Sequence, residues 1–393
     1  MAFDILGGEQ RELRDLVRQL ARERIAPRAA EIDASHEFPW DVVELFREND
    51  IFGLFFEEQY GGLGTGALLS LIAIEEVGKV CATSALILAV QELGSLGLKL
   101  AGSGEQKERY LPKFASGEWL PAYALTESGS GSDSAAMRTM AQREGDEYVL
   151  DGSKRFITNA GVANLYTVFA KTDPDAGHDG ISAFVVESDA PGFAVARLEP
   201  KMGISGSTTG ELTFDSCRIP AANLLGEEGE GFRIAMRILD RSRPGVAAQA
   251  LGIAQGATDY ALEYAKTRAT MGQPIVQHQL IQAKLADMET ECEAARGLLY
   301  RFGRMVDEGV EGPELTKASA MAKLKCGDVA MAVTTEAVQI LGGYGYIREY
   351  PVERFMRDAK ITQIYEGTQE IQRLVIAREM VRESRAFLLA GVG

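Results

Sequence analysis

The sequence contains few cysteines and histidines, and they do not cluster. The four cysteines, Cys81, Cys217, Cys292 and Cys326, are far apart and form no C-x-x-C pair, and the three histidines are equally scattered. Disulfide frameworks and zinc sites need such residues at short, regular spacings. The sequence therefore predicts neither a disulfide-bonded fold nor a metal site, and it favours a reducing, aqueous compartment.

Signals for export, membrane insertion and nucleic-acid binding are also missing. The N-terminus has no basic segment followed by an apolar run, and the longest apolar run, Val80 to Val90, is too short for a bilayer of roughly 30 Å. The formal charge of −16 is spread along the chain, which disfavours nucleic acid and anionic membranes as partners. We expect a cytoplasmic protein, or one of the mitochondrial matrix only if a transit peptide has been removed.

Two common nucleotide-binding patterns are absent as well. No G-x-G-x-x-G follows a strand and opens a helix, and no G-x-x-x-x-G-K-[ST] occurs. Helical and strand patterns do not alternate either, which excludes a doubly wound α/β sheet. Any bound dinucleotide must therefore be held in another way.

The 393 residues divide instead into three stretches of different character. Helical periodicity marks the chain up to about residue 111 and returns after residue 231, whereas short apolar runs bounded by turn residues lie between them. This order predicts an α+β multidomain protein, which consists of an N-terminal α-helical domain (1–121), a middle β-barrel-like domain (122–228) and a C-terminal four-helix bundle (229–393).

The bundle is predicted from two long apolar stripes whose members alternate spacings of four and three. The first stripe comprises Val246, Ala250, Ile253, Ala257, Tyr260 and Tyr264. The second comprises Ile281, Leu285, Met288, Cys292, Ala295, Leu299, Phe302 and Val306. Segments near Lys317 to Ile340 and Gln369 to Leu389 can supply the two helices that cover these stripes.

Four stretches carry residues suited to chemistry or ligand binding, and two of them lie in the middle part. In Ala124 to Asp133, hydroxyls alternate with Gly129 and Gly131, which lets backbone N–H groups approach an anion such as a pyrophosphate. Small polar residues at a domain boundary also form ordinary linkers. Phe156 to Asn159 places an aromatic ring beside a hydroxyl and an amide, which suits either a flat heterocycle or a strand core.

The other two stretches lie in the last helical part. Gly342, Gly343 and Gly345 lie close together between two predicted helices. A helix-to-helix turn explains one or two of these glycines, and a third indicates that a ligand binds there. Glu366 follows an aromatic residue and precedes an apolar helix that Thr368 can cap. It is therefore either a helix-terminal side chain or a carboxylate with a chemical role.

Taken together and in this order, the four stretches resemble the acyl-CoA dehydrogenase family across essentially the whole chain. One family signature is matched from Ala124 to Ala136 and a second from Gln339 to Asp358. The stretch from Tyr365 to Thr368 stands where many members carry their catalytic base. The resemblance implies the three-domain fold, bound FAD, an acyl-CoA substrate, a homotetramer built from dimers, and an electron-transferring flavoprotein as electron acceptor.

The resemblance also implies roles for individual residues, with Glu366 as the catalytic base. The residues implied to contact FAD within the subunit are Tyr123, Leu125, Thr126, Ser132, Phe156, Thr158 and Thr368. Those implied at its adenosine end, mostly from a partner subunit, are Arg268, Met271, Gln279, Gln339 and Gly343. Those implied near the substrate are Asp240, Arg243, Tyr365 and Gly367.

Some of these assignments have alternatives. Certain branches of the family carry their base at the position of Ser242, which cannot act as a carboxylate base, so Glu366 is the expected base. Asp240 and Arg243 are equally well explained by a helix-terminal ion pair.

Three residues depart from the family pattern. Phe156 and Met271 stand where Trp and Phe are common, and Ser128 replaces a frequent Pro. The first two remain large and apolar, so stacking on the cofactor is weakened rather than excluded.

The implied reaction explains why such residues are needed. A proton beside a thioester carbonyl is weakly acidic, so a carboxylate must become more basic than usual through burial, and the developing enolate must be stabilised. In the family, the N–H of the catalytic Glu and a ribityl hydroxyl hold the carbonyl oxygen. A hydride leaves the β-carbon for the flavin, which gives a trans-2-enoyl-CoA.

The expected function is dehydrogenation of a short or branched acyl-CoA, as in fatty-acid or branched-chain amino-acid degradation. A dicarboxylic substrate is disfavoured, because Val80 to Val90 contains no Arg, whereas the similar glutaryl branch carries one there. A flavin oxidase or monooxygenase of the same fold, and a non-catalytic subunit, remain alternatives. The sequence leaves the acyl group, the pathway and the electron acceptor open.

Overall fold

The computed structural model describes residues 6–390, apart from the side chains of residues 9 and 385–390. Its first part is helical and comprises α1 (Gly8–Leu20), α2 (Ala29–Ser35), α3 (Trp40–Glu48), α4 (Ala67–Gly78), α5 (Ala82–Ala101) and α6 (Gly104–Ala115). Ser103 caps α6, because its hydroxyl accepts the Gln106 N–H at 3.2 Å.

Helix α5 is longer than the apolar run in the sequence indicated. It is long and apolar enough to cross a membrane by length and composition, but 78% of its most apolar window is buried inside the molecule. Burial of this kind is typical of the core helix of a globular protein. The apolar run Val80 to Val90 was expected to be too short for a bilayer, whereas α5 as a whole, which continues to Ala101, is long enough by length and composition.

The middle part is a sheet of β1 (Pro121–Ala124), β2 (Met140–Glu144), β3 (Glu147–Thr158), β4 (Leu165–Lys171), β5 (Ile181–Glu187), β6 (Phe193–Leu198), β7 (Thr209–Pro220) and β8 (Leu224–Leu225). The strand order is β6-β7-β3-β2-β4-β5-β8, and β1 pairs in parallel with β4. The Met140–Lys171 pair alone links β2 to β4, so the sheet consists of two halves. Both halves contribute to one apolar core that contains Tyr148, Tyr166, Phe184 and Phe214.

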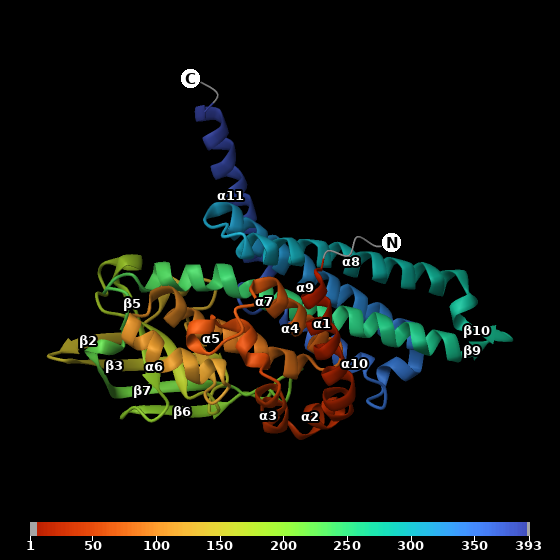
Figure 1. Cartoon of the computed structure of the whole chain (residues 1–393), viewed down its shortest axis with the longest axis horizontal. Coiled ribbons are helices and arrows are strands. Elements are labelled where there is room, and N and C mark those ends of the chain that lie inside the picture. The colour runs from red at the N-terminus through yellow and green to blue at the C-terminus, as the bar shows by residue number, and fades with distance from the viewer. Residues whose placement is uncertain (1–5, 391–393) are drawn as a thin grey trace.

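The last part is formed by α7 (Gly231–Thr267), α8 (Gln279–Asp307), α9 (Pro313–Leu341), α10 (Val352–Ile361) and α11 (Gln369–Ala390). Helices α7, α8 and α9 lie side by side, as Figure 1 shows, and α10 packs against α7 and α9. Both predicted stripes face inward, with Met288, Cys292 and Ala295 of α8 buried. Helix α11 contacts α9, but its far end leaves the body of the molecule (Figure 1).

A short hairpin joins α7 to α8 and projects from the end of the bundle (Figure 1). Its strands are β9 (Ala269–Thr270) and β10 (Gln273–Pro274). Met271 and Gly272 form the turn with φ angles of 51° and 82°, as a two-residue hairpin turn requires.

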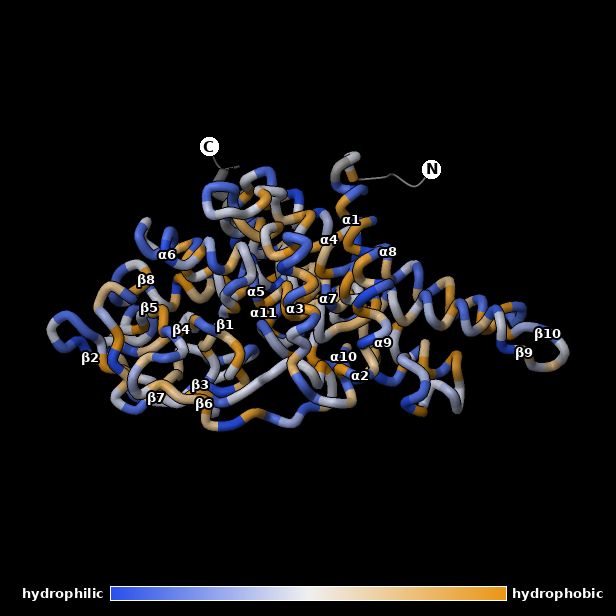
Figure 2. The backbone as a smooth tube through the Cα atoms, turned by 60° about the horizontal axis from the view of Figure 1, so that its bottom comes forward, coloured by the Kyte–Doolittle hydropathy of each residue, from blue (hydrophilic) through white to orange (hydrophobic). Residues whose placement is uncertain are grey.

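The helical parts share one apolar core. A single cluster of buried side chains runs through the first part, the bundle and one face of the sheet. In Figure 2 the apolar segments gather at the middle of the molecule, around α4, α5 and α7. These helices position the elements of the site described below.

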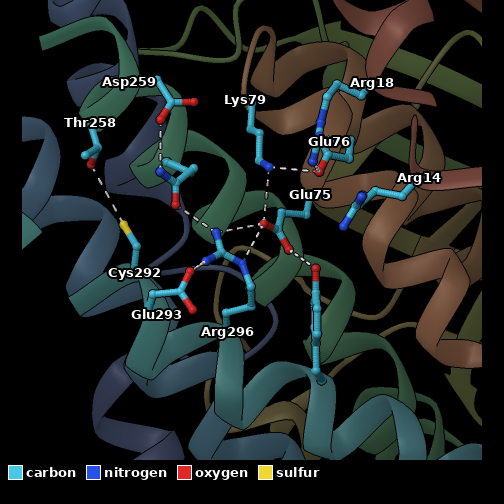
Figure 3. Close-up of polar contacts among 12 residues, drawn as sticks. Arg14, Arg18, Glu75, Glu76, Lys79, Thr258, Asp259, Cys292, Glu293 and Arg296 are labelled. Atoms are coloured by element: carbon cyan, nitrogen blue, oxygen red, sulfur yellow. Dashed lines mark hydrogen bonds and ion pairs between the residues drawn. The ribbon is translucent and has the colours of Figure 1, made fainter. Parts of the chain in front are cut away.

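A buried charge network fixes α4 against the bundle (Figure 3). The Glu75 carboxylate accepts hydrogen bonds from Arg296 Nε at 3.0 Å and Tyr300 Oη at 2.9 Å, both from α8. Arg296 also donates to Gln255 Oε1 of α7 at 2.8 Å. Because the charged groups of Glu75 and Arg296 all find hydrogen-bond or ion-pair partners, these contacts hold α4, α7 and α8 in one register.

Candidate active site around Glu366

Glu366 lies in the turn between α10 and α11. Its φ of 52° and the φ of 91° at Gly367 are both left-handed, and a Cβ at Gly367 would come within 2.6 Å of Gln372 Nε2. Glycine is therefore required at residue 367. The turn directs the Glu366 carboxyl toward α7, where Ser242 Oγ donates to Glu366 Oε2 at 2.6 Å.

The surroundings of Glu366 make its carboxyl unusually basic. Burial raises the pKa of Glu366 to about 7, and this effect exceeds the opposing influence of the Ser242 hydrogen bond and the positive charges of Arg243 and Lys323. The Glu92 carboxyl on α5 raises the pKa further. A carboxylate with a pKa near neutrality is suited to general-base chemistry, because it accepts protons readily and is still ionised.

Several hydrogen-bond donors near this carboxyl have no partner. The side chain of Arg243 is only 5% exposed, yet its Nε makes no hydrogen bond, and neither does the buried Oη of Tyr123 on β1. Across residues 6–390, the Glu366 N–H has no acceptor either. Buried polar atoms of this kind are usually satisfied by a ligand or by water.

Asp240 and Arg243 form the ion pair that the sequence offered as one interpretation. Arg243 Nη1 lies 2.8 Å from Asp240 Oδ1, and Thr316 Oγ1 donates to Asp240 Oδ2 at 2.7 Å. The expected position of this pair at a helix terminus was wrong. Helix α7 begins at Gly231, nine residues before Asp240, so both residues lie inside the helix. Tyr365 lies close by, and its hydroxyl donates to Gln249 of α7.

The sheet presents a large aromatic ring that is only partly covered, since the Arg155 guanidinium lies over the Phe156 ring at 4.9 Å. The pairing of β3 with β7 shifts register between Lys154 and Ile157. Within this bulge Phe156 has a φ of 60° and a side chain that is 56% exposed. A bulky residue in the left-handed region is strained, and such strain is typical of ligand sites. Thr158, half-buried at the end of β3, and Thr126 lie beside this bulge, since the Arg155 N–H donates to the Thr126 carbonyl at 2.8 Å.

The glycine-rich stretch after β1 is an anchored loop with an open side. Glu127 is buried and pairs with Lys154 Nζ at 2.8 Å, and burial lowers the pKa of Lys154 to about 8. A Cβ at Gly129 or Gly131 would meet no atom within 4 Å, so packing within the chain does not require glycine there. Ser132 is exposed on the same loop, whereas Leu125 is buried beneath it. The free backbone of this loop fits a phosphate-bearing ligand.

A second group of the predicted residues lies at the far end of the bundle. Arg268 and Gly343 line a cavity of about 460 Å³, and the Arg268 guanidinium stacks over the Tyr344 ring at 5.3 Å. Among the neighbouring glycines, Gly342 is explained by its φ of 62° and Gly345 by a contact of 2.4 Å with the Val338 carbonyl. Gly343 has neither reason, since a Cβ there would meet nothing within 4 Å. Its place on the cavity supports a ligand contact.

The remaining predicted FAD contacts fall in two places. Met271, at the hairpin tip, is 96% exposed, and Gln279 and Gln339 are exposed on α8 and α9. Thr368 lines a different cavity, of about 570 Å³, beside the Glu366 turn. Along α7, Arg268 lies roughly 39 Å from Ser242 at about 1.5 Å per residue. Within one chain, the structure therefore brings Glu366 together with Ser242 and Arg243 of α7. It separates them from Arg268 and Gly343, which line the cavity at the far end of the bundle.

Sequence reasoning missed several residues that touch the Glu366 turn. Ser242 was considered only as an inadequate base, whereas Lys323, Gln372 and Glu92 were not singled out. No local pattern marks them, because each meets the turn through the fold. In the part of the chain that the structure describes, no group of three or more His, Cys, Asp or Glu side chains can hold a metal ion.

Comparisons with known proteins agree with this geometry. Family models for the N-terminal, middle and C-terminal domains of acyl-CoA dehydrogenase match residues 7–118, 122–217 and 229–381. A helical part, a sheet and a helical bundle that carries Glu366 thus define a flavoenzyme class that oxidises acyl thioesters.

Individual relatives support the same class. Cyclohexane-1-carbonyl-CoA dehydrogenase of Geobacter metallireducens is 48% identical over 378 residues, covering 96% of this chain and 98% of the relative. Butyryl-CoA dehydrogenase of Megasphaera elsdenii superimposes with a TM-score of 0.93 at 44% identity, covering 97% of this chain and 100% of that one. A structure from work on the electron-transferring flavoprotein of Acidaminococcus fermentans matches with a TM-score of 0.94, 44% identity and the same coverage. The chain belongs to the acyl-CoA dehydrogenase family, and it is an FAD-dependent oxidoreductase that acts on acyl-CoA.

Proposed function

We propose that Glu366 is the base that removes the proton next to the thioester carbonyl of a short or branched acyl-CoA. The observation that carries this proposal is a largely buried carboxyl with a pKa of about 7, held by Ser242 at 2.6 Å. Its environment gives the proton affinity that a weak carbon acid requires, and its left-handed turn fixes the direction of the carboxyl.

The donors around Glu366 suit the other half of the reaction. The Glu366 N–H, which has no acceptor among residues 6–390, would donate to a thioester oxygen on which negative charge develops, and the buried Arg243 charge would favour the same anion. Phe156, Thr126, Thr158 and Thr368 are the residues that would hold FAD in the same subunit. When bound, FAD accepts the hydride from the β-carbon.

The charges near the site disfavour an anionic acyl chain. Residues 80–90 carry no basic side chain, and Glu92 places a carboxyl on the next turn of α5. The two cations that interact with Glu92 are already engaged, since Lys99 Nζ donates to the Phe55 carbonyl at 2.6 Å and Arg241 pairs with Glu311 at 3.0 Å. A neutral acyl group is therefore the better match, and butyryl-CoA and cyclohexane-1-carbonyl-CoA, named for the relatives, are suitable first substrates.

We propose further that the enzyme is a homo-oligomer in which two subunits share each FAD. The distance of roughly 39 Å between Ser242 and Arg268 along α7 supports this, because it exceeds the reach of one FAD molecule. An electron-transferring flavoprotein is the proposed electron acceptor, which the similarity to the Acidaminococcus fermentans structure supports. The proposed location is the cytoplasm.

An anaerobic titration with a panel of acyl-CoA esters tests the substrate proposal. Short straight-chain and branched esters are expected to bleach the flavin of the purified protein, and glutaryl-CoA is expected to bleach it far more slowly. Rapid reduction by glutaryl-CoA would contradict the argument from Glu92. Fast reoxidation of the reduced flavin by dissolved oxygen would favour the oxidase alternative over transfer to a flavoprotein.

A further inference from the structure

Lys323 is a fully buried lysine that meets the Glu366 turn. It lies on α9 with 0% exposure, and its Nζ donates to the Gly367 carbonyl at 2.7 Å and to Gln369 Oε1 at 3.3 Å. Among the described residues, both hydrogen-bond acceptors of Lys323 Nζ are uncharged, and burial lowers the pKa of its ammonium to about 7. Lysines are rarely buried in this way unless they are paired, so a packing role alone does not explain it.

The carbonyl that Lys323 holds belongs to the turn that carries the base. Gln372 Nε2 donates to the same Gly367 carbonyl at 2.9 Å and to the Glu366 carbonyl at 3.3 Å. Helix α9 lies directly against this segment, because a Cβ at Gly327 would come within 2.9 Å of Gln369 Nε2. The two left-handed residues of the turn are therefore held from α9 on one side and from α11 on the other.

Two cations favour the ionised form of the Glu366 carboxyl, and the effect of Arg243 on its pKa is larger than that of Lys323. Glu366 faces Ser242 and Arg243 of α7, Lys323 of α9, Glu92 of α5 and Tyr123 of β1. Arg243 is paired with Asp240 at 2.8 Å. Asp328 and Glu370 also interact with Lys323.

We propose that Lys323 is a positioning residue for the base: its ammonium holds the Gly367 carbonyl, and with it the Glu366 turn, while its charge favours the ionised form of the Glu366 carboxyl. This inference rests on the proposed role of Glu366. It adds a residue on a different helix that sets both the direction and the protonation of the base. The Lys323 side chain itself does not touch the reacting atoms.

The experiment compares Lys323→Gln, Lys323→Met and the control Lys325→Met. Lys325 lies two residues further along α9, its side chain is 34% exposed, and it pairs with Glu291. Two quantities are measured across pH: the rate of flavin reduction, and the midpoint of carboxyl protonation by infrared difference spectroscopy. The Glu366 signal in the infrared spectra is assigned by its loss in Glu366→Gln.

Removal of the positive charge raises the pKa of Glu366, so the acid limb of the rate and the infrared midpoint move to higher pH. We expect a shift of about one pH unit or more in both Lys323 variants and no shift in Lys325→Met. Lys323→Gln retains a donor for the Gly367 carbonyl, so its maximal rate at high pH should exceed that of Lys323→Met.

Two outcomes overturn the inference. The first is a Lys323→Gln protein with normal FAD content whose infrared midpoint is unchanged. The second is loss of FAD or of the folded state in both Lys323 variants but not in Lys325→Met, which would show a structural role instead. If the infrared midpoint shifts although the wild-type flavin is reduced by no acyl-CoA, Lys323 is supported and the proposed reaction is rejected.

Discussion

Glu366 should destabilise the folded protein at the pH at which it is active, and Glu366→Gln should relieve this cost. The carboxyl has a pKa of about 7 in the folded protein, compared with 4.5 as its ordinary value. Between these two pH values the folded state binds more protons at this residue than the unfolded state does. The free energy of unfolding therefore falls as pH rises from about 4.5 to 7, and the loss is complete above that range.

The size of the effect follows from the pKa difference. Each pKa unit corresponds to about 1.4 kcal/mol, so ionised Glu366 costs about 3 kcal/mol above pH 7 as an upper value. A glutamine has the same shape, still accepts from Ser242 and does not titrate. The advantage of Glu366→Gln should thus be near zero at pH 4.5 and grow toward 3 kcal/mol at pH 8, while flavin reduction falls roughly a hundredfold or more.

Thermal unfolding at saturating FAD, measured from pH 5 to pH 8, tests this reasoning. The difference in unfolding midpoint between Glu366→Gln and the wild type should widen steadily as pH rises. Glu349→Gln, which removes an exposed carboxyl, serves as the matched control and should show no such trend. A difference that stays constant with pH, or near-normal anaerobic bleaching of Glu366→Gln by acyl-CoA, would refute the assignment.

Two further variants test the cofactor site and the sheet. Arg268→Ala should weaken FAD retention and the oligomer together, because Arg268 lines the cavity at the end of the bundle; gel filtration should show both losses, and Lys266→Ala, an exposed neighbour paired with Glu263, should show neither. Lys154→Met leaves the buried Glu127 without its cation and should cost roughly 3–5 kcal/mol in urea unfolding. Arg218→Ala, which breaks two exposed ion pairs, should cost less than about 1 kcal/mol, and equal losses in the two variants would contradict the argument from burial.

The sequence predicted the elements well where one face of a helix or strand is buried. The α8 stripe is an example, because burial of Met288, Cys292 and Ala295 repeats at helical spacing and leaves a periodic signal. The far end of α11 is a contrast: its pattern indicated a bundle helix, yet it leaves the body of the chain (Figure 1). A stripe reveals that a helix needs a partner, but it does not reveal whether the partner belongs to the same chain.

Charged side chains that are fully buried were not predictable from the sequence in the same way. Lys154 and Lys323 lie in segments where a lysine is ordinarily solvent-exposed, and both are fully buried. Their acceptors are 27 and 44 residues away in the sequence, so no short window contains both partners. The left-handed φ of Phe156 is equally invisible, because it arises from the bulge between β3 and β7. The role of Glu366 was predicted from the family resemblance, whereas its contacts with Ser242 and Lys323 became evident only from the fold.

Buried charge alone does not mark the active site in this protein. Glu75 is as deeply buried as any carboxylate in the helical core, yet Arg296, Tyr300 and Lys79 satisfy it completely (Figure 3). Around Glu366 the reverse holds, since buried donors of Arg243 and Tyr123 are left without acceptors. The contacts of Glu75 hold α4 in register with its neighbouring helices, and they leave no hydrogen-bonding group of the carboxylate for another molecule. The arrangement around Glu366 is complete only when a polar ligand supplies the missing acceptors, and this difference is the physical reason to place the chemistry at Glu366.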